Sequence, residues 1–280
     1  MVAWQASRID GGVMPDAWEE LQRFLTLHRA GGPGRCVSEP PPWPGPTLFG
    51  GNVIAQAVVA GTRYAPAGLR LHSMHASCVR PVQPSVSVAY EVDTVREGRT
   101  LTTRRVTARQ SDKVVFDMSC SLTADTDGEE TYDLPVGSGV PGPDGLPVQA
   151  GPGVWLQVVL GPTEARDDGT RASTHRKWCR VGVGIPEDPH LHTALRACAT
   201  DMTGMAGRPH QVGAAPAAMV SLDHAVWFSR PTRADRWLLH DVHCLVSAGG
   251  RSLIRGTLSD EDGRIVVASS QEIKLTARPG

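Results

Sequence analysis

The chain of 280 residues carries 28 basic and 29 acidic side chains, and this near balance excludes nucleic acid as an expected partner. Its length is enough for one large domain or for two domains of about 140 residues. The six cysteines are far apart and form no C-x-x-C pair, so we expect apolar fillers in a reducing compartment. No apolar run reaches membrane-spanning length and the N-terminus lacks a signal-peptide core, which predicts a cytoplasmic protein without membrane insertion.

The first half of the chain shows a buried helix followed by β-rich runs. Apolar spacing predicts a short amphipathic helix over residues 15–28, and the Gly/Pro content of residues 30–46 predicts a loop. Residues 52–64 are apolar on nearly every side, which indicates a helix inside a core. Turns at residues 97–98 and 111–112 are expected to join the later strands as hairpins. The predicted strands are 72–80, 86–96, 100–110 and 114–123.

The second half of the chain repeats this order of elements. Residues 125–153 are rich in Gly, Pro and Asp, which predicts a linker. A strand at 178–183 then leads into a helix at 190–202. The strands predicted after this helix are 219–228, 237–246, 253–259 and 265–275. Because helix and meander occur twice, we expect two copies of one α+β unit, at residues 1–124 and 154–280.

The start of the first buried helix has features of a binding site. Gly50 and Gly51 let another group approach the helix N-terminus, where free N–H groups and the helix dipole favour a carbonyl oxygen or an anion. Asn52 and Gln56 lie four residues apart and therefore share one helix face. The alternative for these two side chains is that they are solvated or bond to nearby backbone.

Two histidines, His72 and His75, lie three residues apart on the first predicted strand. Histidine pairs suggest zinc, but no nearby residue completes a ligand set here. We therefore expect no metal ion.

The predicted strand at 219–228 is mostly apolar but contains Ser221, Asp223 and His224. Burying such groups is costly unless each finds a partner, so at least one is expected to serve chemistry. Side chains alternate along a strand, which predicts that Ser221 and Asp223 share one face and that His224 points to the other. Since no G-x-S-x-G motif surrounds Ser221 either, a Ser-Asp-His hydrolase is not favoured. Asp223 and His224 are instead expected to be structural partners in the interior.

Asp201 comes at the end of the second predicted helix. It shares a helix face with Ala194 and Ala197, small residues that would pack closely on a sheet. A carboxylate in such a place needs hydrogen-bond partners. The alternative is that Asp201 only caps the exposed end of a fraying helix.

Taken together, these pieces resemble the acyl-CoA thioesterase II family, the tandem hotdog thioesterases. The similarity covers nearly the whole chain outside the linker and loops. The similar segments are 48–57, 71–75, 80–81, 96–99, 104–106 and 110 in the first half, and 195–197, 201, 221–224, 227–228 and 268–272 in the second. The resemblance implies an α+β double hotdog, in which each half wraps an antiparallel sheet around its helix and the acyl thioester lies where the halves meet.

The resemblance also implies a catalytic set. The family's Asp, Ser or Thr, and Gln correspond to Asp201, Ser221 and Gln271, and all three residue types are kept. We expect the substrate to contact Gly50, Gly51, Asn52, Gln56 and His72. The chain has Asn52 where the family usually has Gln, and it lacks the aromatic residue that usually precedes Arg80-Pro81. These differences concern the identity of the substrate more than the type of reaction.

The expected reaction is hydrolysis of an acyl-CoA or acyl-carrier-protein thioester, without a cofactor. Asp201 would act as general base, or orient the water, while Ser221 and Gln271 hold that water. One alternative is a non-hydrolytic hotdog enzyme, such as a dehydratase, isomerase or cyclase, that uses a histidine with an acid. Another is a catalytically silent acyl-CoA binder. Tandem hotdogs of this family often pair, so the resemblance implies a homo-oligomer.

Overall fold

The fold is described from a computed structural model that covers residues 17–40, 47–124, 132–134, 139–151, 153–160, 174–203 and 218–276. In the first half the elements are α1 (Ala17–Leu25), β1 (Leu27–Arg29), β2 (Arg35–Ser38), α2 (Gly50–Thr62), β3 (Leu69–Cys78), β4 (Ala89–Arg96), β5 (Leu101–Gln110) and β6 (Lys113–Ala124). In the second half they are β7 (Gln149–Ala150), β8 (Trp155–Val159), β9 (Thr174–Val181), α3 (Pro189–Thr200), β10 (Ala218–Ser221), β11 (Asp223–Phe228), β12 (Leu238–Ala248), β13 (Arg251–Ser259) and β14 (Ile265–Thr276).

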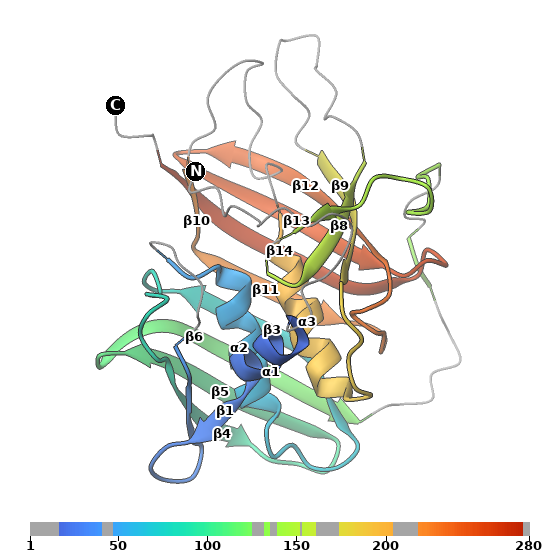
Figure 1. Cartoon of the computed structure of the whole chain (residues 1–280). Coiled ribbons are helices and arrows are strands. Elements are labelled where there is room, and N and C mark those ends of the chain that lie inside the picture. Colours follow the sequence, from blue (N-terminus) through green and yellow to red (C-terminus); the bar gives the residue numbers. More distant parts are fainter. Residues whose placement is uncertain are drawn as a thin grey trace.

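The strands of the described chain form one antiparallel 14-stranded sheet that contains the same unit twice (Figure 1). In the first half β2-β4-β5-β6-β3 are neighbours, and in the second half β9-β12-β13-β14-β11 follow the same order. The two halves join where β3 pairs with β11, from Ser77 opposite Asp223 to Ser73 opposite Trp227. The repeated order of helix and meander, expected from the sequence, is therefore present.

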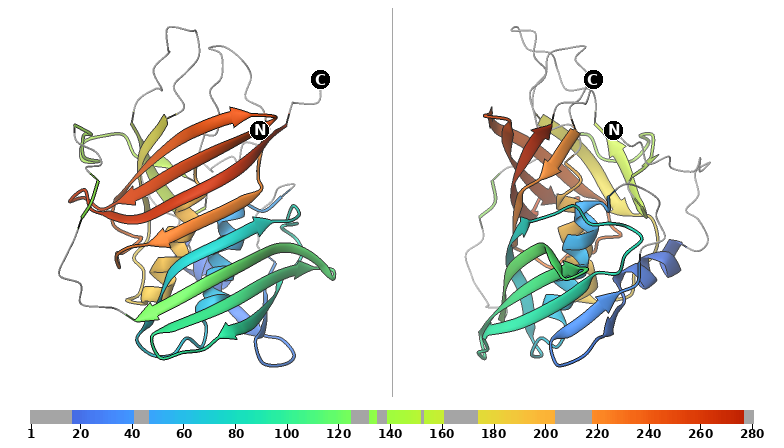
Figure 2. Two further views of the ribbon diagram at one scale, coloured as in Figure 1. Left: turned by 180° about the vertical axis from the view of Figure 1, so that it is seen from behind. Right: turned by 90° about the vertical axis from the view of Figure 1, so that its left-hand side faces the viewer.

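The two long helices lie side by side on the concave face of this sheet. Figure 2 shows the sheet curving around α2 and α3, with the opposite face of its central strands left uncovered by helices. Most of α2 is buried, as its uniformly apolar sequence predicts. The start of α2 meets the end of α3, because a Cβ on Gly51 would lie 2.7 Å from the carbonyl oxygen of Cys198. The helices are thus antiparallel. Within the described residues, no helix is long and apolar enough to cross a membrane.

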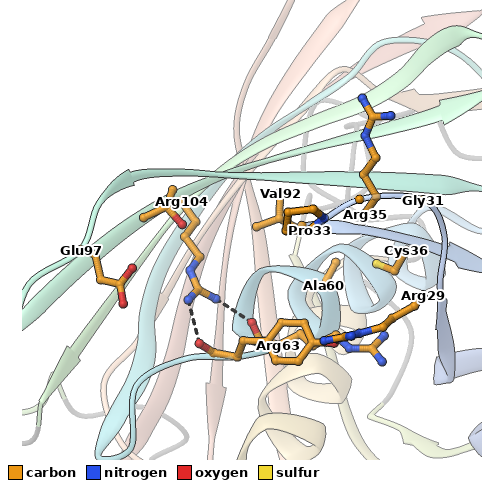
Figure 3. A pocket seen from close by; sticks show the side chains of 14 residues that line it. Arg29, Gly31, Pro33, Arg35, Cys36, Ala60, Arg63, Val92, Glu97 and Arg104 are labelled. Atoms are coloured by element: carbon orange, nitrogen blue, oxygen red, sulfur yellow. Dashed lines mark hydrogen bonds between the residues drawn. The ribbon is translucent and has the colours of Figure 1, made fainter.

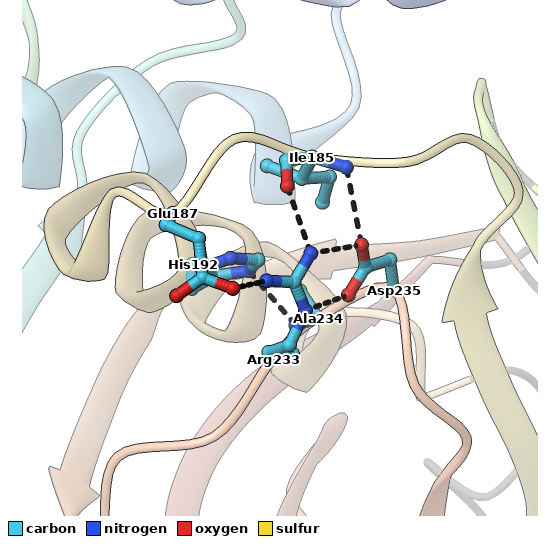
Figure 4. A network of polar contacts seen from close by, with 6 residues as sticks. All are labelled: Ile185, Glu187, His192, Arg233, Ala234 and Asp235. Carbon is cyan, nitrogen blue, oxygen red and sulfur yellow. Dashed lines mark hydrogen bonds and ion pairs between the residues drawn. The ribbon is translucent and has the colours of Figure 1, made fainter.

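The N-terminal end of α3 is held by two loops. The Asp188 carboxylate caps the helix by accepting hydrogen bonds from the N–H groups of His190 (2.9 Å) and Leu191 (3.3 Å), and Pro189 begins the first turn. Below this cap, Arg233 from the loop after β11 donates to Asp235 and to the Ile185 carbonyl (2.8 Å). Figure 4 draws this network of Ile185, Glu187, His192, Arg233, Ala234 and Asp235. These contacts fix the direction of α3 and hence the position of its far end.

Two parts of the sequence-based expectation were wrong. The segment 30–46, expected to be a loop, contains β2, which pairs with β4, and residues 41–46 of it lie outside the described range. The helix expected over 15–28 ends at Leu25, and Leu27–Arg29 forms β1 against β2. Both strands are too short to show a period-two pattern, so the edge of the sheet decides their conformation.

The second half differs from its expected elements in two places. Within the segment 125–153, expected to be a linker, β7 pairs with β8, a strand that the sequence did not indicate. The strand expected over 219–228 is interrupted at Leu222, which separates β10 from β11. This interruption affects the candidate site.

Candidate active site

Asp201 follows the last turn of α3 and lies against the first turn of α2. Only 9% of its surface is exposed. A Cβ on Gly50 would lie 2.7 Å from Oδ2 of Asp201, closer than two such atoms can approach. The glycine pair at the start of α2 therefore makes room for the carboxylate. The positive end of the α2 dipole favours a negative charge there.

Three side chains from distant parts of the chain meet at this point. The Gln271 amide nitrogen on β14 donates to Oδ1 of Asp201 at 2.7 Å and to Oγ of Ser221 at 2.7 Å. The Ser221 hydroxyl donates to the same Oδ1 at 3.3 Å. Pairing of β10 with β14 places Ser221 opposite Ile273, which brings these two strands together beside the end of α3. The residues named from the sequence as a catalytic set are thus in mutual hydrogen-bond contact.

The environment of Asp201 changes its acidity. Burial raises the pKa of the carboxyl from 3.8 to about 6, against the opposing effects of the Gln271 amide, the Gly51 N–H and the Ser221 hydroxyl. A carboxyl with this pKa is mostly ionised at pH 7 and is a stronger base than an exposed aspartate. This is the acidity that suits a general base near neutral pH.

A cleft of about 490 Å³ opens onto this carboxylate. Gly50, Asp201 and Ser221 contribute to its wall, and both halves of the chain line it. The apolar part of its lining is Leu48, Phe49, Val53, Val79, Pro81, Val82, Val115, Phe116, Met219, Val220, Leu222 and Ile273. Arg80, an exposed side chain, also belongs to the lining. This arrangement can hold an apolar chain with its polar end beside Asp201.

His224 also approaches Asp201, contrary to the expected alternation. Its Nδ1 lies 3.8 Å from Oδ1 of Asp201, and its Nε2 lies 2.9 Å from the Thr200 hydroxyl. The alternation holds within β11, where His224 is buried and Asp223 is exposed. The interruption at Leu222 shifts its phase, so that Ser221 and His224 both face Asp201. The expectation that Asp223 lies in the interior was wrong, since its carboxylate accepts a bond from the Glu272 N–H (2.8 Å) at the surface.

The state of His224 follows from its partners. The Thr200 hydroxyl lies 2.7 Å from the Ala197 carbonyl and 2.9 Å from Nε2 of His224, so its single proton serves one of these two acceptors, and the tautomer of the ring follows from that choice. Burial lowers the pKa of His224 to about 4, so the ring is neutral near pH 7. His224 does not line the cleft, so it is not placed to contact a molecule bound there.

The residues expected to bind substrate separate into two groups. Gly50 lines the cleft and Gly51 lies next to it, beside Asp201. Asn52 does not line the cleft; its Oδ1 lies 3.9 Å from the Cys198 sulfur on α3. His72 is half-buried at an irregularity in the pairing of β3 with β6 and does not line the cleft either.

Gln56 belongs to the core of the first half. It is fully buried, donates to the Phe24 carbonyl at 2.7 Å and accepts from the Tyr90 hydroxyl at 2.7 Å. Both ends of its amide are therefore used by the protein. These partners are distant in the sequence, so they differ from the alternative weighed for this residue, which was solvation or a bond to nearby backbone.

Some residues of the site were not indicated by the sequence. Thr200 and Phe116 were not singled out, and Cys78 received attention only as a filler. Cys78 lines the cleft, and burial together with the charges of Asp201 and Asp223 raises the pKa of its thiol to about 12. The adjacency of Thr200 to Asp201 was an available signal. No local pattern points to Phe116 and Cys78, because the pairing of β3 with β6 on one side and with β11 on the other brings them there.

Comparisons with known proteins agree on one family. The family model described as the acyl-CoA thioesterase N-terminal domain matches residues 39–123, and the model of the C-terminal domain matches residues 138–274. Acyl-coenzyme A thioesterase 8 of Rattus norvegicus is 29% identical over 262 residues, covering 83% of this chain and 81% of that protein. Acyl-CoA thioesterase 2 of Haemophilus influenzae is 28% identical over 251 residues, with 80% and 86% covered.

Solved structures show the same fold. The crystal structure of an acyl-CoA thioesterase II, TesB2, from Mycobacterium marinum superposes with a TM-score of 0.77 at 28% identity, covering 93% of this chain and 98% of that one. A protein with a hot dog fold from Alicyclobacillus acidocaldarius reaches 0.74 at 16% identity, covering 92% and 98%, which supports the fold alone. The expected α+β double hotdog is confirmed. This chain belongs to the acyl-CoA thioesterase family.

Proposed function

We propose that the protein hydrolyses acyl-CoA thioesters to a free acid and a free thiol, with Asp201, Ser221 and Gln271 as the catalytic set. One observation carries this proposal: a buried carboxylate with a pKa of about 6, bonded to a hydroxyl and an amide, lies at the wall of an apolar cleft. The reaction needs a base for water beside a place for the acyl chain, and this cleft offers both.

In the proposed mechanism Asp201 accepts a proton from a water molecule as the water oxygen attacks the thioester carbonyl carbon. Ser221 and Gln271, which bond to one another and to Asp201, orient this water. The tetrahedral intermediate then collapses, the carbon–sulfur bond breaks, and the proton held by Asp201 passes to the leaving thiolate. First-turn N–H groups of α2 have no partner within the helix, and the N–H of Gly50 is our candidate to stabilise the oxyanion.

The positions of the histidines favour hydrolysis over a non-hydrolytic reaction such as dehydration. A dehydratase needs a histidine at the substrate, but His224 is buried, neutral and absent from the cleft lining. His75 is exposed and packs edge-on against Trp227, with ring centroids 5.3 Å apart. Neither residue is placed to exchange protons with a molecule in the cleft.

The finer features of this function are proposals as well. The apolar cleft supports an aliphatic acyl chain, and with it a place in fatty-acid and lipid metabolism in the cytoplasm. An acyl-carrier protein is a second possible donor of the thioester. The division into domains at 1–124 and 154–280 is supported by the repeated order of strands, while β7 at the end of the expected linker 125–153 pairs with the second unit. Trp227 is 43% exposed near the centre of the outer sheet face, which supports a homo-oligomer that covers it.

The proposed reaction is tested by thiol release. The wild-type protein is incubated with acetyl-, octanoyl- and palmitoyl-CoA, and free CoA is followed with a thiol reagent. We expect turnover with at least one chain length and stoichiometric free acid. Measurable binding of all three esters without thiol release would contradict the proposal and favour a binding protein. A modified acyl-CoA product without thiol release would favour the non-hydrolytic alternative.

A further inference from the structure

The C-terminal end of α2 carries arginines where the C-terminal end of α3 carries Asp201. Arg63 is the C-cap residue of α2, as Asp201 is of α3. Arg104 reaches this end from β5 and donates to the carbonyls of Gly61 (2.8 Å), Arg63 (2.7 Å) and Tyr64 (2.9 Å). These contacts satisfy carbonyl groups at the negative end of the helix. The two repeats therefore place opposite charges at equivalent helix ends.

A pocket of about 640 Å³ lies beside the arginine end of α2 (Figure 3). Its lining contains four arginines and one acidic residue, Glu97. The arginines are Arg29, Arg35, Arg63 and Arg104. In Figure 3 Arg104 reaches towards the end of α2, where Arg63 and Arg29 also lie, and Glu97 stands apart from these three. No residue of this lining also lines the cleft at Asp201, so the two cavities are distinct.

Several hydrogen-bond donors around the pocket have no acceptor among the described residues. Arg104 is only 5% exposed, and its Nε is buried without a partner in that part of the chain. Arg29 uses its Nε for the Tyr64 hydroxyl (2.9 Å), which leaves its two terminal nitrogens without a described acceptor. Arg29 is exposed, so its terminal nitrogens can bind the oxygen atoms of a ligand, whereas the buried Nε of Arg104 is an unsatisfied donor inside the protein.

Tyr64 holds two of the arginines beside the pocket. Its backbone has φ of 62°, a left-handed conformation that is rare for an aromatic residue. Its ring is 60% exposed, and the guanidinium carbons of Arg29 and Arg63 each lie 5.4 Å from its centroid. The ring therefore orders two arginines next to each other despite their like charges. The left-handed backbone of Tyr64 belongs to the turn from Thr62 to Ala65, in which the Ala65 N–H donates to the Thr62 carbonyl at 2.9 Å.

We propose that this arginine pocket binds the phosphate groups of a small phosphate-bearing molecule, at a site separate from the catalytic cleft. Guanidinium groups bind phosphate oxygens in paired, charge-assisted bonds, and phosphates offer enough oxygens for several arginines. The turn at Gly31-Gly32 lines the same pocket, and at both glycines the space that a Cβ would occupy is open or nearly so, which lets a ligand approach the backbone. A volume of about 640 Å³ accommodates more than a single ion.

Two kinds of molecule could supply the phosphate groups that bind in the arginine pocket. One is the phosphate-bearing nucleotide part of CoA, whether as substrate or as product. The other is a separate phosphorylated molecule. Helix α2 has 13 residues and so spans about 20 Å from its start at Asp201 to the arginine end. Its two ends would therefore contact different ligands or distant parts of one ligand.

The test is calorimetric titration of the whole protein with inorganic pyrophosphate at low salt. The variant is Arg29→Gln with Arg63→Gln, and the control is Arg105→Gln, a neighbour of Arg104 that is exposed and paired with Asp117. We expect binding to weaken at least about tenfold in the double variant and to stay within about twofold in the control. Absence of binding to the wild-type protein at millimolar pyrophosphate, or equal weakening in the control, would overturn the proposal.

Folding and ligand source are separated by further measurements. Arg63 also donates to the Leu27 carbonyl, so circular dichroism checks the double variant and Arg29→Gln alone provides a milder case. The ligand is the nucleotide part of CoA if CoA displaces pyrophosphate from the wild-type protein and the double variant has a raised KM for acyl-CoA. The KM of the double variant for acyl-pantetheine, which lacks the nucleotide, should then be unchanged. Loss of pyrophosphate binding with both KM values unchanged identifies a separate ligand. The titrations measure binding without turnover, so their outcome does not depend on whether the protein hydrolyses acyl-CoA.

Discussion

The two ends of the antiparallel pair α2 and α3 have the same backbone arrangement but opposite chemistry. At one end the start of α2 has no side-chain cap, and its glycines face the Asp201 carboxylate. At the other end the start of α3 is closed by Asp188, which accepts from two first-turn N–H groups. A repeated fold thus offers two possible sites, and the capping residue and the glycines decide which helix start is open to a substrate.

The charges at the helix C-termini complete this contrast. Asp201 follows α3, where the dipole of its own helix disfavours a carboxylate, and only the start of α2 and the side chains of Ser221 and Gln271 offset this. Arg63 follows α2, where the helix dipole favours a cation. The unfavourable arrangement lies at the proposed catalytic end and the favourable one at the arginine pocket. The end that is proposed to perform chemistry therefore carries the charge that is less favourable for the stability of the fold.

The largest expected effect is at Asp201. Replacing it by Asn should lower kcat for acyl-CoA hydrolysis at least about 10²-fold, because the base is removed while the shape is kept. Since the folded-state pKa of Asp201 is raised to about 6, the native state loses stability as pH rises from 4 through 6.

The Asn variant is free of this loss and should be up to about 3 kcal/mol more stable than the wild type at pH 8, with the gain disappearing near pH 4. Urea denaturation at the two pH values measures this difference. Turnover close to wild type in Asp201→Asn would remove this residue from the mechanism, whatever its stability.

The next effect concerns the glycine that makes room for the carboxylate. Gly50→Ala places a methyl group 2.7 Å from Oδ2 of Asp201, and the side chain must move. We expect kcat/KM to fall about 10- to 100-fold with little change in the melting temperature, because displacement of a catalytic group by about 1 Å has this cost.

Pro189→Ala, at the start of the other helix, is the matched control and should leave kcat/KM within about twofold. If both variants lost activity equally, the two helix starts would not differ in function as described.

A smaller change in kcat/KM is expected when the pH is lowered. With a pKa of about 6, the ionised fraction of Asp201 falls about tenfold between pH 7 and pH 5, so kcat/KM should fall by the same factor. His224 has a pKa lowered to about 4 and should not contribute to the fall of kcat/KM between pH 7 and pH 5. The measurement is a pH profile of kcat/KM for the wild type and for His224→Gln. A profile flat between pH 5 and 7 would argue against Asp201 as the base.

The smallest effect is expected at the capped end. Asp188→Ala removes the acceptor of two N–H bonds at the start of α3 and should lower the free energy of unfolding by about 1 kcal/mol. kcat should not change, since Asp188 does not line the cleft at Asp201. Thermal denaturation together with thiol release would check both statements. A large loss of kcat at unchanged stability would show that the capped end takes part in catalysis.

The sequence by itself determined the repeated α+β architecture and named the residues that meet at the site. Helix and strand periods are local properties, so α2, α3 and the longer strands were found with errors of a few residues. The resemblance supplied Asp201, Ser221 and Gln271, whose catalytic role stays a prediction until it is tested. Asn52, Gln56 and His72 were also named from the sequence, as substrate contacts, but none of them lines the cleft.

Only the tertiary structure decided how these pieces are combined. Pairing of β3 with β11 brings the two halves together, and the break at Leu222 turns Ser221 and His224 towards the same carboxylate. Gln56 on α2 is bonded to Tyr90 on β4, a contact that its helical spacing does not specify. The reason is physical: burial, the pKa of Asp201 and the choice of hydrogen-bond partner depend on groups far away in the sequence, whereas periodicity reports only on neighbours along the chain.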